Sequence, residues 1–106
     1  MCLWHADFVE KNANKINMKN MKKLEKTLKA LANRRRLAIL AYLKRLGEAK
    51  VGAVAQEIGL SIKATSRHLV LLSRAGIVER EQRGLEAFYS LADRQETVVE
   101  CVASVL

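Results

Sequence analysis

Hydrogen-bonding and cationic side chains are concentrated in one short stretch in the middle of the chain. Within eight residues the sequence places two hydroxyls, an ammonium, a guanidinium and an imidazole, on Ser61, Lys63, Ser66, Arg67 and His68. These groups donate hydrogen bonds to anionic oxygens and to the polar edges of planar rings. The set therefore predicts recognition of an anionic, hydrogen-bonding partner.

Residues for covalent chemistry or metal binding are sparse. The two histidines, His5 and His68, lie far apart, and the two cysteines, Cys2 and Cys101, lie at opposite ends of the chain. The sequence contains no glycine-rich phosphate loop, nucleophile motif or spaced set of metal ligands. We therefore expect neither an enzyme nor a bound cofactor.

The charge balance also favours a polyanionic partner. Lys and Arg number 19 against 11 Asp and Glu, a net charge of +8. Nucleic acid is the first candidate and an anionic membrane surface the second. Charge alone leaves open a third reading, a basic surface that only keeps the protein in solution.

Cysteine usage and the N-terminal sequence predict a cytoplasmic protein. Two cysteines form no disulfide framework, which favours a reducing compartment. The segment from Met1 to Glu10 contains no apolar stretch of signal-peptide length, and no segment approaches the roughly 20 apolar residues that span a bilayer. We expect no membrane association, and one domain, because 106 residues suffice for a single core.

Apolar spacing divides the chain into an arm and a helical domain. Residues 1–20 are expected to form a loosely ordered arm, and residues 21–106 the domain. Helical spacing begins at Met21 and continues through Leu24, Leu28 and Leu31. A second helix should be capped by Asn33 and end at Gly47.

The polar set lies on the second of two helices joined by a tight turn. Val51 to Ile58 fits a short helix that stops at Gly59. Ser61 can then cap a helix that runs to about Ala75, with Leu69 and Leu72 facing the core.

A hairpin and a last helix complete the predicted fold. Ile77-Val78 and Leu85 to Leu91 have strand character, and Arg83-Gly84 supplies the turn between them. The final helix should begin near Ala92 or Asp93 and present apolar residues including Val98, Val102 and Val105.

This order of elements, mostly α with a small β-hairpin, is typical of a winged helix-turn-helix. From about Leu24 to Leu91 the chain resembles the ArsR family of bacterial and archaeal regulators. The matching segments are Leu28-Lys-Ala-Leu-Ala-Asn33, Arg36-Leu37-Ala-Ile-Leu40, Val54-Ala-Gln-Glu-Ile-Gly-Leu-Ser61, Ser66-Arg67-His68-Leu69, Ala75-Gly76-Ile77-Val78 and Phe88-Tyr89.

The resemblance implies a sequence-specific regulator of transcription, expected to act as a repressor that binds an inverted repeat in double-stranded DNA as a homodimer. It implies DNA contacts from the recognition helix by Ser61, Lys63, Ser66, Arg67 and His68, and phosphate contacts from the wing by Arg80 and Arg83. It also implies dimerisation through the first and last helices, by Met21, Leu24, Val98, Val102 and Val105.

Four positions depart from the family pattern or face away from DNA. Ile62 and Ala64 replace the Gln and Thr that the family often has, which removes two hydrogen-bonding groups from the first turn of the recognition helix. Thr65 is expected to face the core. Arg34 replaces the usual proline, which the start of a helix tolerates.

The metal sites familiar in this family lack their ligands here. One uses a cysteine pair on the third helix, where this chain has Val51-Gly52-Ala53. The other uses Asp and His on the last helix; Asp93, Glu96 and Glu100 are present, but no histidine follows Arg80. We expect no metal.

The inducer is left unidentified by the sequence. Cys2, His5 and Asp7 cluster near the N-terminus, and an approach to Cys101 across a dimer would make a metal or thiol-redox sensor. The simpler reading is that Cys101, which lies among valines, is a small core residue.

One alternative belongs to another class of function. A winged-helix module can serve protein assembly without sequence-specific DNA binding, and Ile62 and Ala64 leave room for this role. Lys63, Arg67 and Arg74 argue against it. RNA binding is weaker still, because the basic segments lack stacking aromatic residues.

Overall fold

The first helix begins at a capping asparagine. The computed structural model describes residues 16–106, and within them α2 (Met18–Leu31) starts where the Asn17 side chain accepts hydrogen bonds from the backbone N–H groups of Lys19 and Asn20. The apolar spacing predicted a start at Met21. The helix begins one turn earlier because the cap, rather than the first apolar residue, sets its end.

The next two helices begin or end at the capping residues that the sequence predicted. In α3 (Arg34–Leu46), the Asn33 side chain accepts from two backbone N–H groups, and Gly47 ends the helix at φ 86°. Helix α4 (Val51–Ile58) ends at Gly59, which is left-handed at φ 68°. Both glycines adopt a backbone conformation that L side chains rarely take. These two predictions are confirmed.

The fourth predicted helix is also confirmed. Helix α5 (Ile62–Arg74) is capped by Ser61, whose Oγ accepts from the N–H of Ala64 at 3.1 Å. The chain leaves the helix through Gly76 at φ 75°.

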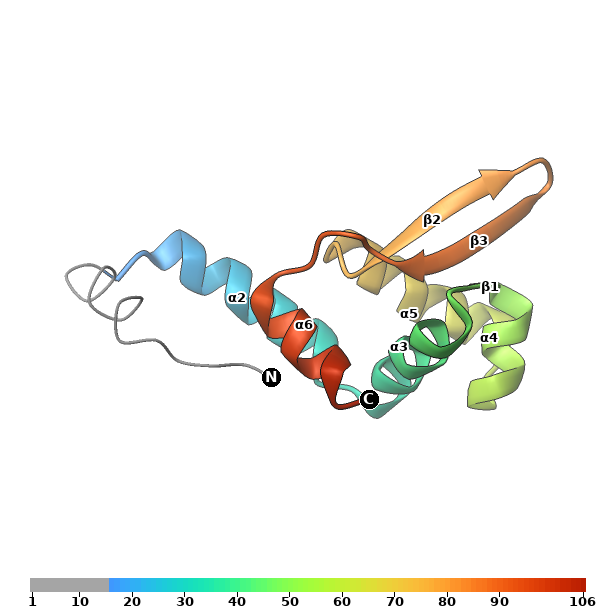
Figure 1. Cartoon of the computed structure of the whole chain (residues 1–106), viewed down its shortest axis with the longest axis horizontal. Helices are drawn as coiled ribbons and strands as arrows, with labels where there is room; N and C mark the ends of the chain where they lie inside the picture. Colours follow the sequence, from blue (N-terminus) through green and yellow to red (C-terminus); the bar gives the residue numbers. More distant parts are fainter. Residues whose placement is uncertain (1–15) are drawn as a thin grey trace.

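The strands form an antiparallel sheet in the order β1-β3-β2. The hairpin of β2 (Val78–Arg83) and β3 (Glu86–Leu91) extends away from the helices as the wing, on the opposite side of the molecule from α2 (Figure 1). Strand β1 (Glu48–Lys50) was not predicted, because three residues carry no periodic pattern. Leu85, predicted in a strand, is a fully exposed residue of the turn.

The last helix starts later than expected. Helix α6 spans Thr97–Ser104, so the predicted start near Ala92 or Asp93 is wrong. The Gln95 side-chain amide donates to the carbonyls of Ile77 and Ala92, at 2.8 and 3.1 Å, and the Ala92 N–H also donates to Ile77. These bonds hold the segment before α6 as a turn against the start of β2.

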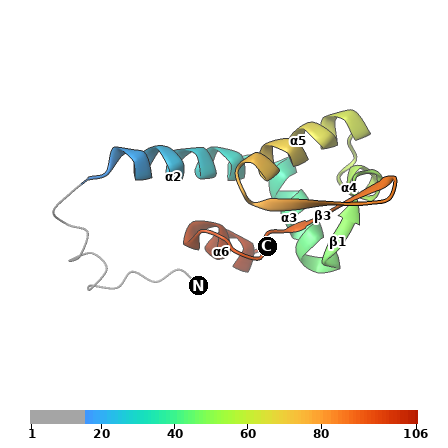
Figure 2. The same ribbon diagram turned by 90° about the horizontal axis from the view of Figure 1, so that it is seen from above.

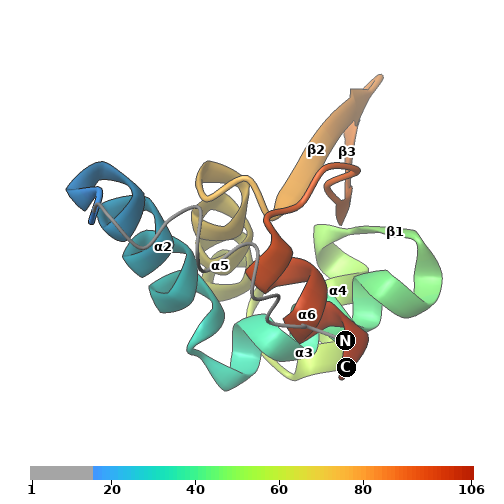
Figure 3. The same ribbon diagram turned by 60° about the vertical axis from the view of Figure 1, so that its left-hand side comes forward.

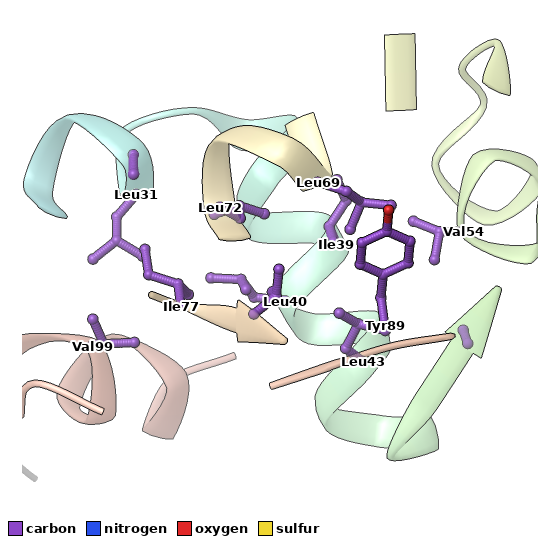
Figure 4. Packing of buried hydrophobic residues seen from close by; sticks show 13 residues of the cluster. Leu31, Ile39, Leu40, Leu43, Val54, Leu69, Leu72, Ile77, Tyr89 and Val99 are labelled. Atoms are coloured by element: carbon purple, nitrogen blue, oxygen red, sulfur yellow. The ribbon is translucent and has the colours of Figure 1, made fainter. Parts of the chain in front are cut away.

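The core surrounds α3. Ile39, Leu40 and Leu43 of α3 pack against Leu69 and Leu72 of α5, and further side chains of α4, the sheet and α6 close the cluster, among them Val54, Ile77, Tyr89 and Val99 (Figure 4). All of these residues are at least nine-tenths buried. The core therefore fixes α5, the element that carries the polar set, against α3.

Candidate nucleic-acid interface

The geometry of α4, its turn and α5 is that of a helix-turn-helix. Left-handed Gly59 reverses the chain direction, and the Leu60 N–H donates to the Ala55 carbonyl at 3.1 Å. Ser61 then caps α5. Helices α4 and α5 pack on each other and on α3. This packing holds α5 at the surface in a fixed orientation (Figure 2).

Helix α5 has a core side and an exposed side. Thr65, Leu69 and Leu72 are fully buried, as the sequence predicted for these three residues. The opposite side carries Lys63 and Arg67, both exposed, and half-buried Ser66 between them. Residues three and four apart share one face of a helix, so these three side chains form a single polar stripe.

The first turn of α5 is partly committed to structure. The Ser61 hydroxyl, predicted to contact DNA, caps the helix through its oxygen. Next to it, the Ile62 side chain is 57% exposed. An exposed isoleucine offers an apolar contact surface but no hydrogen bond.

His68 lies apart from the polar stripe. Its ring is half-buried toward α3, with Nδ1 3.4 Å from Nη1 of Arg36. Burial and the positive charges of Arg36 and Arg35 lower the pKa of His68 below its ordinary value of 6.5. Because a guanidinium only donates, the contact requires an unprotonated Nδ1. The structure thus places His68 at a contact between helices, and base contact by this residue stays a prediction.

Arg36 joins three helices. Its Nε donates to the Ala30 carbonyl at 2.6 Å and its Nη2 to the Lys29 carbonyl at 3.0 Å, both at the end of α2, while Nη1 approaches His68 of α5. Carbonyls at a helix end lack partners within the helix, and Arg36 supplies them. Arg36 belongs to one of the segments that resemble the ArsR family, but no sequence pattern predicts its contacts.

The two wing arginines differ in their surroundings. Arg80 is exposed and donates to the Gln82 side chain at 2.6 Å. Arg83 donates to both carboxylate oxygens of Glu48, at 3.1 and 2.7 Å, and to Glu81 at 2.8 Å. Its guanidinium also lies 4.4 Å from the centre of the Phe88 ring.

These contacts stabilise the charged forms of the wing. Hydrogen bonds from Arg83 lower the pKa of Glu81, and the bonds to Glu81 and Glu48 raise the pKa of Arg83. Arg83 is therefore one cation shared by two carboxylates. Phosphate contact by Arg83 stays a prediction, because it requires the guanidinium to leave one of these partners. No sequence pattern indicates the Arg83–Glu48 pair, because Glu48 lies 35 residues away on the unpredicted β1.

Apolar residues on α2 form a surface suited to a second subunit. Met21 and Leu28 are each 45% exposed, and with half-buried Leu24 they line a shallow groove along α2. Of the predicted α6 residues, Val98 and Val102 are half-buried against the core, whereas Val105 is 81% exposed just beyond the helix. The Thr27 hydroxyl of α2 donates to Glu96, the residue before α6, at 2.8 Å, and this bond joins the two helices. Figure 3 shows the positions of α2 and α6.

The residues of the sensor hypothesis are only partly described. Cys2, His5 and Asp7 lie outside residues 16–106, and Cys101 is half-buried in α6. Within residues 16–106, no group of three or more His, Cys, Asp and Glu side chains is placed to hold a metal ion. No helix in this part of the chain has the length and apolar character needed to cross a membrane.

Comparison with known proteins agrees with this geometry. A family model described as a helix-turn-helix domain matches residues 31–81. The transcriptional activator HlyU of Vibrio cholerae is 39% identical over 77 residues, covering 73% of this chain and 70% of HlyU. A Staphylococcus aureus homologue of the cadmium resistance transcriptional regulatory protein CadC is 34% identical over 89 residues, covering 84% of this chain and 74% of that protein.

Solved structures extend the likeness to three dimensions. Reduced HlyU from Vibrio cholerae superposes with a TM-score of 0.69 at 38% identity, covering 84% of this chain and 90% of that one. The winged helix-turn-helix domain Mb0332 of Mycobacterium bovis is described as homodimeric and as a possible ArsR-family regulator. It superposes with a TM-score of 0.72 at 34% identity, covering 88% of this chain and 85% of that one.

Proposed function

Because this chain belongs to the ArsR family of winged helix-turn-helix transcriptional regulators, we propose that it binds double-stranded DNA as a homodimer and regulates transcription from an inverted-repeat operator. Each subunit places α5 in a major groove, and two-fold symmetry sets the two half-sites roughly one helical turn apart. Bound over a promoter, the dimer represses transcription by occupying the DNA.

The polar stripe on α5 carries this proposal. Lys63 and Arg67 are exposed on a helix whose opposite side is anchored in the core, and within residues 16–106 neither forms an ion pair. Lys63 and Arg67 are available for phosphates or base edges, and Ser66 lies between them for shorter-range hydrogen bonds. Arg80 supplies a phosphate contact from the wing, and Arg83 does so by exchanging a carboxylate for a phosphate.

Dimerisation is supported by the uncovered apolar groove of α2. The exposed sides of Met21 and Leu28 lie next to Leu24 on the same face. A symmetric interface buries one such face against its copy. The Mycobacterium bovis domain of similar fold is described as homodimeric, which agrees with this assignment.

The experiment is a fluorescence-anisotropy titration of the protein against labelled duplex from upstream of its own gene and against a scrambled duplex, at two salt concentrations. We expect tighter binding to the upstream duplex, weakened by salt as counterion release requires. Equal and weak binding to both duplexes contradicts the proposal and favours the protein-assembly role, for which the exposed Ile62 would be the contact.

Repression has its own test. In a reporter strain, deletion of the gene should raise transcription from the promoter that the protein binds, and restoring the gene should lower it. A fall in transcription on deletion would contradict repression while leaving operator binding intact.

A further inference from the structure

A groove with an apolar floor and a cationic rim runs between α2 and α5. Its volume is about 830 Å³, within the range of small-molecule sites. Helix α5 supplies most of its lining, along the face that carries the polar stripe, and α2 contributes Lys26 and Ala30. Figure 2 shows that α2 reaches α5 only near the C-terminal end of α5 and then runs away from it. The groove is distinct from the α2 groove lined by Met21, Leu24 and Leu28.

The lining places apolar side chains between cations. Along α5, Lys63 and Arg67 come first, Val70 and Leu71 follow, and Arg74 closes the series. Val70 is 42% and Leu71 40% exposed, so both present apolar surface to the groove. A groove that leaves two aliphatic side chains uncovered gains free energy when an apolar ligand removes them from water.

The charges in the groove are of one sign. Lys63, Arg67 and Arg74 of α5 and Lys26 of α2 line it, and none of its lining residues within 16–106 is acidic. In that part of the chain, none of these four cations forms an ion pair. An anionic group is therefore the complement of the rim, and a carboxylate suits a guanidinium because it accepts two parallel hydrogen bonds.

We propose that this groove binds an amphipathic organic acid, a small molecule with an aliphatic body and a carboxylate. The body covers Val70 and Leu71, and the carboxylate pairs with cations of the rim. Lys63, Ser66 and Arg67 belong both to this groove and to the DNA-contacting stripe. The bound acid therefore competes with DNA, a consequence that rests on the proposed function, whereas binding of the acid does not.

The test begins with isothermal titration calorimetry of the full chain with decanoate, below its micelle-forming range. We expect saturable binding at one site per subunit. Acetate keeps the carboxylate without the apolar body, and 1-decanol keeps the body without the charge, so neither should bind comparably. Absence of decanoate binding, or equal binding of decanol or acetate, overturns the proposal.

Variants locate the site. Lys26→Gln and Val70→Gln should each weaken decanoate binding, by about three- to tenfold. Neither residue belongs to the predicted DNA contacts. Lys22→Gln and Met18→Gln are matched controls on exposed positions of α2 outside the groove, and should leave decanoate affinity unchanged. Wild-type affinity in both groove variants overturns the site.

A competition experiment separates this proposal from the proposed function. Decanoate should release labelled operator duplex from the wild-type protein, and Val70→Gln should need a higher decanoate concentration for the same release. If the duplex binds but decanoate neither binds nor displaces it, the ligand site is wrong and the DNA function stands. If decanoate binds but the duplex does not, the failure belongs to the proposed function.

A second copy of the chain is the other occupant that such a groove admits. In that case Val70→Gln would convert the dimer to a monomer in sedimentation equilibrium, and decanoate would not bind the wild-type dimer. We expect the variant to remain dimeric, and the monomeric result would overturn the proposal.

Discussion

The exposed face of α5 and the β2–β3 wing both carry arginine, but the two regions hold its charge differently. Arg67 is exposed and forms no ion pair within residues 16–106. Arg83 contacts two carboxylates and the face of Phe88. A cation that is already paired must exchange partners to bind phosphate, whereas an unpaired one needs only to lose water. The net charge of +8 belongs to the whole chain and does not show which cations are unpaired. Arg67 on α5 is free to bind phosphate, whereas Arg83 on the wing is already paired.

The largest expected effect comes from removing the unpaired cation. Arg67→Ala should weaken operator binding about ten- to a hundredfold, as expected for a charge-assisted contact, and should lower the salt slope by about 1. Anisotropy titrations at several salt concentrations measure both quantities. Arg45→Ala removes an arginine that pairs with Glu57 at 3.1 Å on another face, and serves as the matched control. If both variants bind alike, the role of α5 in DNA binding is wrong.

The next effect separates positioning of α5 from contact by it. Ser61→Ala should cost about 1 kcal/mol of unfolding free energy, because the cap to the Ala64 N–H is lost. Urea denaturation measures the cost.

Ser61→Asn keeps the cap and removes the hydroxyl. We expect this variant to retain both stability and DNA affinity. Reduced affinity at unchanged stability would assign the hydroxyl a direct DNA contact instead.

A smaller effect tests the paired cation. Arg83→Ala should reduce DNA affinity less than Arg67→Ala, and Glu48→Gln should raise it, by about two- to fivefold, because it releases the guanidinium. Both are measured in the same titration at low salt. Glu57→Gln removes an equivalent charge from the Arg45 pair and should change affinity less. Equal losses of DNA affinity in Arg83→Ala and Arg67→Ala would contradict the proposed difference between α5 and the wing.

The smallest effect concerns His68, which lies between α5 and α3. Its folded-state pKa is lowered by burial and by Arg36 and Arg35, so the unfolded chain binds the proton more readily. Stability should therefore fall as the pH drops below 6.5, the ordinary pKa value, toward the lower folded-state value. Urea midpoints at pH 7.5 and 5.5, at one protein concentration, should differ less in His68→Gln than in the wild type. An identical pH dependence in the two proteins would contradict a lowered pKa of His68 in the folded state.

Helix-capping and helix-ending residues predicted most of the helix boundaries around α5. Asn33, Gly47, Gly59 and Ser61 act on backbone within a few residues of themselves, so their effects are visible in the sequence. The start of α6 was not visible, because the Gln95 amide bonds to Ile77, 18 residues earlier. Three-residue β1 likewise exists through its pairing with β3.

The site itself divides in the same way. The buried positions Thr65, Leu69 and Leu72 follow from helical periodicity. The same periodicity places His68 at the edge of the buried face, and this signal could have predicted its half-buried position. Arg36 contacts Ala30 and His68, and Arg83 contacts Glu48, at separations of 6 to 35 residues along the chain, and no local rule identifies these partners. Whether an arginine is free to bind phosphate therefore depends on the partners that the fold brings to it.

The central claim, that α5 rather than the wing carries the main DNA contact, is tested most directly by an NMR titration. The ¹⁵N-labelled protein is titrated with operator duplex, and backbone amide shifts are compared between α5 and the hairpin. We expect the largest shifts around Lys63 and Arg67, with smaller ones at Arg80 and Arg83. Shifts confined to the hairpin, or absent from α5, would contradict it.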